Sequence, residues 1–395
     1  MKIASTASVP TAAEVLAFRR EFPIFETKIH LANNSKGALS NAVIRAHEEY
    51  LETWKTGGAP WHTWVGKHEE LRASFAEMIG ANVHEIAVCP SVSVALSSIA
   101  SCLNWRQRSA VVFDDFSFPS VTYLWHAQAV RGAEIRRVHP DDNGEIPPDA
   151  FDAVLDERVQ AVSVAHVCYK NGHRLDLNAI ARKVHKFGAW LIVDDYQSSG
   201  SRCLDVRRAG IDILATGTVK FMLGSPGVAL LYVRDGLLPE LHPTLTGWFG
   251  QKNPEDFQVE RHIESPDATR FQNGTPAIPA IYDSLAGIKQ IQSVGLAKIG
   301  AWIDQLTALL MDRLKEEGFI SATPTDPAKR GPQVAVRSYD MEAAVAELAR
   351  RNIYVTSRDE NIRIAFHYYN TPDDIEALIE NLKQMPKLMI RAVKA

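Results

Sequence analysis

The chain has 395 residues, of which 46% are hydrophobic and 23% charged, an ordinary composition for a globular protein that argues against wholesale disorder. Lys and Arg number 43 against 47 Asp and Glu, a formal net charge of −4 at pH 7, so the chain lacks the basic excess usual in proteins that bind nucleic acid or membrane surfaces. The four cysteines, at positions 89, 102, 168 and 203, form no CxxC pair, so we expect neither a zinc ribbon nor a disulfide scaffold, and a reducing, cytoplasmic location.

The first part of the chain alternates between helix-length amphipathic segments and short apolar strands. Short β-branched runs separated by helices are typical of βαβ units, so we predict an α/β fold with a mostly parallel sheet. Neither the N-terminal residues nor any later run provides the continuous apolar stretch of a targeting signal or membrane helix, and we expect neither. After a short N-terminal helix, the pattern predicts helices at 41–54, 68–79, 94–103, 121–131 and 177–186, and strands at 110–113, 134–138, 159–167, 190–193, 213–215 and 228–233.

The last part of the chain is smaller and has a different pattern. A helical segment at 278–315 is longer than usual, with a candidate break at 293–295. We therefore predict three parts: an N-terminal segment (1–30) that packs with the small domain, a large domain (31–280), and a linking helix with a small α+β C-terminal domain (281–395). Beyond the long helix the sequence predicts a strand at 333–336, a helix at 341–351, strands at 353–356 and 362–366, and a helix at 372–382.

Lys220 lies in the segment TGTVKFMLGSPGVALLYVR (216–234), between a predicted strand and a turn rich in glycine and proline. It is not on the amphipathic face of a helix, where solvated lysines usually lie. Small neighbours such as Gly217 and Gly224 let a flat ligand approach closely. Taken alone, an ordinary surface lysine in a loop is still the simpler interpretation.

Asp194 and Gln197 follow the apolar strand at 190–193. Ligands of α/β sheets bind outside the carboxyl ends of strands, and a carboxylate that is partly buried there needs a cationic or hydrogen-bonding partner. The alternative role for Asp194 is to cap a helix that follows.

Ser91 and Ser93 stand at the start of the apolar helical run CPSVSVALSSIA (89–100). Free backbone N–H groups and the positive end of the helix dipole make a helix start suitable for a phosphate, although ordinary N-capping is the commoner role of serine there. The thirteen histidines include no HExxH-like pair, so no metal site is expected.

A lysine able to form a Schiff base, an acidic partner for a pyridinium nitrogen and a phosphate site are together what pyridoxal 5'-phosphate (PLP) requires of a protein. In these features the chain resembles the fold-type-I PLP-dependent enzymes of the class V aminotransferase group, which includes cysteine desulfurases and kynureninases. The resemblance extends from LANNSKGALS (31–40) to IRIAFHYYNTPDDIEALI (362–379). It implies a large PLP-binding domain with a mostly parallel, seven-stranded sheet and a small C-terminal domain.

The resemblance assigns roles around the cofactor ring. It makes Lys220 the Schiff-base lysine and later the base that moves the Cα proton. Asp194 would pair with the pyridine nitrogen, and Gln197 would hydrogen-bond the phenolic oxygen of the ring. Phe118, in FSFPS, matches the residue that stacks on the ring face.

It also assigns roles around the phosphate. Val92 and Ser93 match the phosphate-binding backbone and hydroxyl, with Thr218 nearby. Thr275, in RFQNGTPAI, matches a threonine that reaches the phosphate from the partner subunit. That assignment implies a homodimer with shared active sites.

Two residues are assigned to the substrate. Arg363 corresponds to the arginine that binds the substrate α-carboxylate, where a planar, bidentate group fixes which Cα bond stands perpendicular to the ring. The alternative for Arg363 is an ordinary strand arginine that is paired across the sheet. Asn34 lies in the segment that matches the substrate side of the family's N-terminal region.

Several segments resemble kynureninases in particular: FPS at 118–120, VCYKNG at 167–172 and GWFG at 247–250. Tyr169 and Trp248 thereby match pocket positions of those enzymes. We expect both residues to contact the cofactor.

Three departures make kynurenine hydrolysis doubtful. Val121 stands where kynureninases have an aspartate, Gln197 where they have a histidine, and Val219 where they have a tyrosine.

Cysteine desulfuration is improbable for a different reason. Desulfurases carry a histidine directly before the Schiff-base lysine, where this chain has Val219, and a nucleophilic cysteine in the C-terminal half. No cysteine follows Cys203 here, and a persulfide mechanism needs a thiolate within reach of the substrate.

The leading hypothesis is therefore an aminotransferase, or a closely related PLP lyase, acting on a small-molecule α-amino acid. A kynureninase-like hydrolase or a C–S or C–C β-lyase is the alternative. A non-catalytic protein of the PLP fold is a third hypothesis, against which the set Lys220, Asp194 and Arg363 argues.

Overall fold

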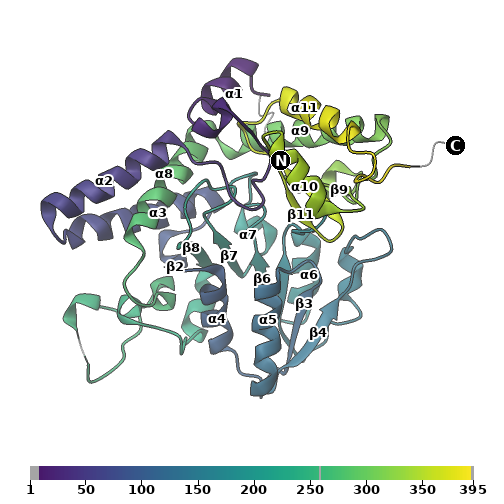
Figure 1. Ribbon diagram of the computed structural model, residues 1–395. Coiled ribbons are helices and arrows are strands. Elements are labelled where there is room, and N and C mark those ends of the chain that lie inside the picture. Colours follow the sequence, from purple (N-terminus) through teal and green to yellow (C-terminus); the bar gives the residue numbers. More distant parts are fainter. Residues whose placement is uncertain (1–8, 258, 393–395) are drawn as a thin grey trace.

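The computed structural model describes residues 9–257 and 259–392, and a seven-stranded sheet forms the centre of its larger part (Figure 1). The strand order is β2-β8-β7-β6-β5-β3-β4, in which β8 runs antiparallel to both of its neighbours and the remaining pairs are parallel. The predicted α/β class with a mostly parallel sheet is confirmed. The strands are β2 (Ile86–Cys89), β3 (Ala110–Asp114), β4 (Glu134–Val138), β5 (Val159–Ala165), β6 (Trp190–Asp194), β7 (Ile213–Gly217) and β8 (Ala229–Val233).

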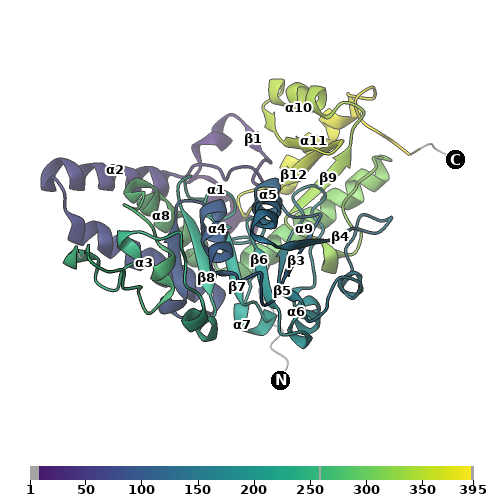
Figure 2. The same ribbon diagram turned by 90° about the horizontal axis from the view of Figure 1, so that it is seen from below.

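Helices cover both faces of this sheet, as Figure 2 shows, with α4 and α5 on one side and α6 and α7 on the other. Successive residues of one strand serve the two faces: Ile192 packs with the α4–α5 side, whereas Leu191 and Val193 pack with the opposite side. Because both faces are covered, the inner strands are apolar along almost their whole length. The helices are α4 (Val92–Cys102), α5 (Pro119–Ala127), α6 (Leu177–Lys186) and α7 (Val206–Ala209).

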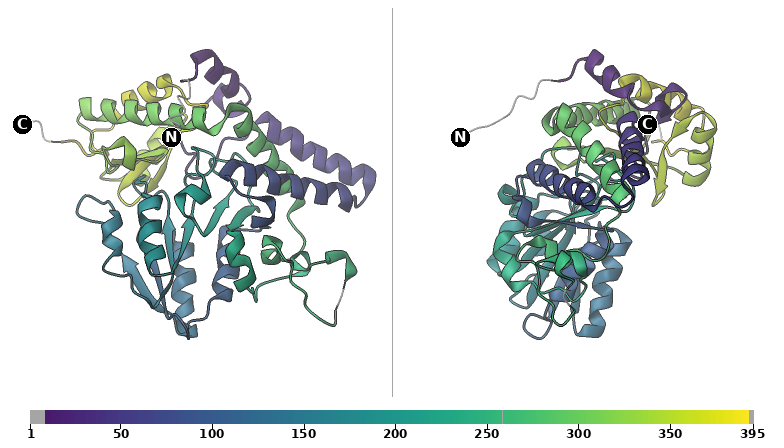
Figure 3. Two further views of the ribbon diagram at one scale, coloured as in Figure 1. Left: turned by 180° about the vertical axis from the view of Figure 1, so that it is seen from behind. Right: turned by 90° about the vertical axis from the view of Figure 1, so that its left-hand side faces the viewer.

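Two helices that precede the sheet pack beside the helices that leave it. Figures 1 and 3 show α2 (Asn41–Gly57) and α3 (Trp61–Ile79) lying along α8 (Ile278–Val294). The predicted break in the long helix is found at Gly295, whose φ of 90° separates α8 from α9 (Leu296–Glu316). In the described part of the chain no single helix is long and apolar enough to cross a membrane. Helices α8 and α9 reach that length and apolar composition only when they are counted together, and they are bent by 81° where they meet.

The C-terminal part contains a smaller antiparallel sheet of order β11-β12-β9. The predicted strand at 353–356 is in fact two strands, of which β10 pairs with β1 near the N-terminus and β11 pairs with β12. Helix α1 (Ala12–Arg19) also contacts this part, because Arg19 forms an ion pair of 2.7 Å with Asp374. The other elements are β1 (Ile29–His30), β9 (Gln333–Arg337), α10 (Met341–Arg350), β10 (Ile353–Tyr354), β11 (Thr356–Arg358), β12 (Asn361–Ala365) and α11 (Pro372–Lys383).

Helix α1 and strand β1 both contact the C-terminal part, and residues 1–8 lie outside the described part of the chain. The division into three parts, with boundaries at 30 and 280 and with residues 1–30 packed against the small domain, stays a prediction.

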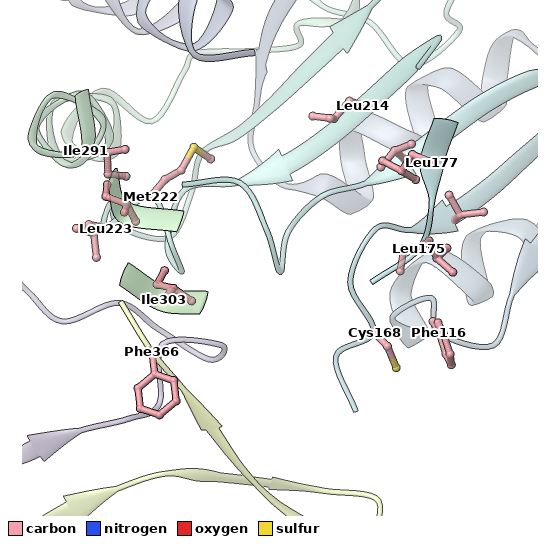
Figure 4. Close-up of a cluster of buried hydrophobic side chains, with 14 of the residues drawn as sticks. Phe116, Cys168, Leu175, Leu177, Leu214, Met222, Leu223, Ile291, Ile303 and Phe366 are labelled. Atoms are coloured by element: carbon pink, nitrogen blue, oxygen red, sulfur yellow. The ribbon is translucent and has the colours of Figure 1, made fainter. Parts of the chain in front are cut away.

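Buried side chains connect the turn after β7 to the C-terminal part. Figure 4 shows Met222 and Leu223 beside Ile291 of α8, with Ile303 of α9 and Phe366 further along the same cluster. All five are almost completely buried. The turn that carries Lys220 is therefore held by packed neighbours rather than left as a surface loop.

Candidate active site

A cavity of about 400 Å³ opens at the carboxyl ends of the parallel strands, a size within the usual range for small-molecule sites. Its walls come from the start of α4, the start of α5, the end of β6 and the turn after β7. Five predicted site residues lie outside its lining: Asn34, Thr218, Trp248, Thr275 and Arg363. The predicted site residues that line it are Val92, Ser93, Phe118, Tyr169, Asp194, Gln197 and Lys220.

Lys220 presents its amine to this cavity from a tight turn. The Leu223 N–H donates to the Lys220 carbonyl at 3.2 Å, and the N–H of Gly37, between β1 and α2, donates to the Val219 carbonyl at 2.9 Å. Burial lowers the pKa of Lys220 to about 8; Arg363 acts in the same direction and Asp194 opposes it. About a tenth of the amine is therefore neutral, and hence nucleophilic, at pH 7, far more than for an ordinary lysine.

Asp194 ends β6 between Ala165 of β5 and Ala215 of β7. Only 7% of the residue is exposed, and its Oδ1 accepts a hydrogen bond from the Tyr196 N–H at 3.0 Å. Burial raises its pKa to about 6. A carboxylate in such a place favours a nearby cation, and a protonated pyridine nitrogen is one that fits.

The start of α4, where a phosphate site is predicted, borders the cavity. Ser91 is the N-cap, accepting from the Val94 N–H at 3.2 Å, so the capping role anticipated for it is real. The N–H groups of Val92 and Ser93, in the first turn, have no carbonyl partner within the helix and border the cavity. Thr218 faces elsewhere: its hydroxyl lies 2.8 Å from the Ser284 Oγ of α8.

Between Asp194 and the start of α4, the cavity is bordered by side chains that suit a flat ring. Phe118 is 43% exposed at the cavity and meets Tyr169 edge-on, with 5.2 Å between ring centroids. Gln197 donates from Nε2 to the Asn34 carbonyl at 3.1 Å, while its buried Oε1 has no hydrogen-bond partner among the described residues. An aromatic face and an unsatisfied amide beside Asp194 fit a planar cofactor that carries a hydroxyl.

Arg363 lies in β12, behind Tyr169. Its Nη1 donates to the Tyr169 carbonyl at 2.6 Å, and its buried Nε has no partner among the described residues. Tyr169 lies outside the β11-β12-β9 sheet, so this bond is not the pairing across the sheet considered as an alternative, and no ion pair of Arg363 is found among the described residues. Most of the guanidinium donors therefore have no protein partner there.

Asn34 uses both ends of its side-chain amide within the protein. Its Nδ2 donates to the Gln333 Oε1 at 2.7 Å, and its Oδ1 accepts from the Thr356 hydroxyl at 3.1 Å. Asn34 therefore connects the loop between β1 and α2 to the small sheet. A direct substrate contact stays a prediction.

Trp248 and Thr275 belong to a neighbouring surface unit. Trp248 packs edge-on against Phe249 and Trp61, with ring centroids 4.5 and 6.2 Å away. Thr275 is exposed and lines a hollow of about 140 Å³ that shares Gly227 with the wall of the main cavity.

Sequence reasoning missed Tyr196, which lies between two residues that it singled out. The Tyr196 ring lines the cavity, and the Lys220 Nζ lies 4.2 Å from its centroid. The signal was present in the segment VDDYQ, where an aromatic residue stands one position before Gln197.

The four cysteines are unpaired and none of them lines this cavity. Burial raises the pKa of Cys89, Cys102 and Cys168 to about 12, so these thiols are protonated at neutral pH. A thiolate nucleophile is accordingly not part of this site.

Comparison with known proteins gives a consistent result. A family model described as "Aminotransferase class-V" matches residues 29–378. The chain is 33% identical to the uncharacterized aminotransferase YcbU of Bacillus subtilis (strain 168), covering 92% of this chain and 96% of that protein. It is 26% identical to the kynureninase of Geobacillus thermodenitrificans (strain NG80-2), over 93% of this chain and 90% of that protein. The apo structure of a cysteine desulfurase from Thermococcus onnurineus NA1 has the same fold, with a TM-score of 0.86 at 22% identity, over 97% of this chain and all of that one.

Proposed function

The chain belongs to the class V aminotransferase family, whose members use PLP, and from this we propose that it transfers the amino group of an α-amino acid, with Lys220 as the covalent attachment point of the cofactor. One observation carries the proposal: a buried lysine amine faces Asp194 in a cavity that also contains the open N-terminus of α4. The aminotransferase named among the relatives supports transamination as the reaction.

The residues of the chain divide the work of that reaction. Bound PLP would supply an electron sink for the bonds at the substrate Cα. Lys220 takes the proton from Cα and later returns one, which its pKa near neutrality suits. Asp194 keeps a proton on the pyridine nitrogen, and Arg363 binds the substrate carboxylate so that the Cα–H bond is presented to Lys220.

The reaction class is testable by following the cofactor during turnover with a panel of α-amino acids. We expect the visible band of the lysine-bound cofactor to be replaced by the near-ultraviolet band of pyridoxamine phosphate, and a keto acid to restore the visible band. Without an added keto acid the protein should turn over once per site. Release of alanine or pyruvate with the lysine-bound band retained would instead assign the lyase or hydrolase chemistry of the alternatives.

We further propose a homodimer with shared active sites. Thr275 is exposed beside the cavity wall of its own subunit. The surface unit to which Thr275 and Trp248 belong also presents Phe257, which is 73% exposed and whose ring centroid lies 6.0 Å from that of Trp248. An exposed aromatic group of this kind is typical of a protein interface. The four unpaired cysteines also support a cytoplasmic location.

Complementation between two inactive variants tests the shared site. Lys220→Ala and Thr275→Val chains, co-expressed with different tags, should form mixed dimers in which one site combines an intact Lys220 with the partner subunit's Thr275. At a PLP concentration limiting for Thr275→Val alone, roughly a quarter of the wild-type activity should return, because half the dimers are mixed and each has one complete site. A particle mass of 43.8 kDa, or no recovery in the mixed dimer, would contradict the proposal.

A further inference from the structure

Tyr196 forms a wall of the cavity directly beside the catalytic amine. The Lys220 Nζ lies 4.2 Å from the centroid of the Tyr196 ring and 5.9 Å from that of Phe118. An ammonium group within about 6 Å of a ring face is attracted by the ring quadrupole, and the attraction grows when water is excluded. Of the two rings, Tyr196 is much the closer partner.

The position of the Tyr196 ring depends on Gly217, the last residue of β7. A Cβ atom placed on Gly217 would lie 2.1 Å from the Tyr196 Cζ and 2.2 Å from its hydroxyl oxygen. No side chain other than hydrogen leaves room for the ring there. Gly217 and Tyr196 are thus a matched pair, in which a missing side chain on one strand admits a large one from its neighbour.

The charged groups around Lys220 act on its ammonium form in opposite directions. Asp194, from β6, favours the ammonium form of Lys220, and Arg363, from β12, disfavours it. Tyr196 and Tyr169 are themselves uncharged near neutral pH, because burial raises the pKa of both phenols. Once Asp194 pairs with the pyridine nitrogen of the cofactor, the face of Tyr196, 4.2 Å from the Lys220 Nζ, is the remaining favourable neighbour of the amine.

We propose that Tyr196 is a positioning residue that holds the ammonium form of Lys220 against its ring face whenever the lysine is not bound to the cofactor. The proposal rests on the proposed role of Lys220. The lysine amine must receive a proton from the substrate and keep it within reach of the cofactor. A ring that attracts the ammonium keeps Nζ in place between removal and return of that proton.

The pH dependence of cofactor binding tests this proposal. The full-length protein is stripped of PLP, and the rate constant for covalent attachment of added PLP is measured by visible absorbance between pH 6 and 10. The midpoint of this pH profile is the pH at which the rate constant reaches half its maximum. The ionisations of PLP itself are common to all variants, so differences in this midpoint report on Lys220. Circular dichroism confirms that each variant is folded.

Four variants distinguish the effect of the Tyr196 ring face from the effect of its hydroxyl and from the effect of its volume. Tyr196→Phe should keep the wild-type midpoint, because the ring face is retained. Tyr196→Leu should lower the midpoint by roughly 0.5 to 1 pH unit, and Gly217→Ala should lower it similarly by displacing the ring. The double variant Tyr196→Leu/Gly217→Ala should show no further shift beyond Tyr196→Leu.

An unchanged midpoint in Tyr196→Leu, or a midpoint that rises, would overturn the proposal, since a rise means that the ring only excludes water from the amine. A midpoint that also falls in Tyr196→Phe would overturn it too, by assigning the effect to the hydroxyl. If the wild-type protein attaches no PLP at all, the proposed function fails instead, which is a different outcome from any of these.

Discussion

Replacement of Lys220 with alanine is expected to abolish covalent attachment of PLP and to lower kcat by about 10²- to 10⁴-fold, the usual contribution of a positioned proton-transfer group. The amine is the nucleophile that faces the cavity, its pKa is about 8, and the turn that carries it is fixed by Met222 and Leu223 in the core. Removing the side chain shortens a half-buried residue without breaking that packing, so the variant should remain folded.

Borohydride reduction followed by peptide mass analysis measures the expected loss directly. Wild-type protein should yield one peptide, containing Lys220, with the added mass of the reduced cofactor. Lys186→Ala, at the exposed end of α6, is a matched control and should behave as wild type. A reducible adduct that persists in Lys220→Ala would show that another lysine is the attachment point.

The regular elements of the large domain could be predicted because their signals are local. The strand at 134–138 and the helix at 177–186 were predicted to the residue, since each is an uninterrupted pattern bounded by polar or turn residues. Strand β2 (Ile86–Cys89) was not predicted. It has only four residues, and its place at the antiparallel edge beside β8 depends on pairing with residues about 145 positions later in the chain.

The strand ends predicted which residues come together in the site, but they did not predict the direction in which single side chains point. Asp194, Gln197 and Lys220 follow buried strands and therefore meet at one edge of the sheet. Thr218, two residues before Lys220, has its hydroxyl beside Ser284 of α8 because that helix packs there. Tyr196 reaches the amine only because Gly217 on the next strand has no side chain. Both outcomes are set by tertiary neighbours, which a local pattern does not contain.

Arg363 is the second position at which a large effect is expected. Replacing it with leucine should lower kcat/KM by about 30- to several-thousand-fold, the range that corresponds to the ~2–5 kcal/mol lost when one partner of a buried charge pair is removed. The lysine-bound PLP band should persist, because Arg363 lies outside the lining of the cavity that contains Lys220, Asp194 and the start of α4. Arg363→Lys should recover only part of the loss, since an ammonium keeps the charge but not the planar pair of donors.

Arg363 also supports Tyr169 through the hydrogen bond from its Nη1 to the Tyr169 carbonyl, so a structural loss must be separated from a loss of carboxylate binding. The amine analogue of the substrate, which lacks the α-carboxylate, provides that separation. If Arg363 binds the carboxylate, the wild-type protein should prefer the amino acid strongly and Arg363→Leu should react with both compounds at similar, low efficiency. Arg337→Gln, which removes a solvent-facing arginine from β9 of the same sheet, should retain the wild-type preference. An equal loss toward both compounds in Arg363→Leu would make the residue a support for Tyr169 alone and place the carboxylate elsewhere in the cavity.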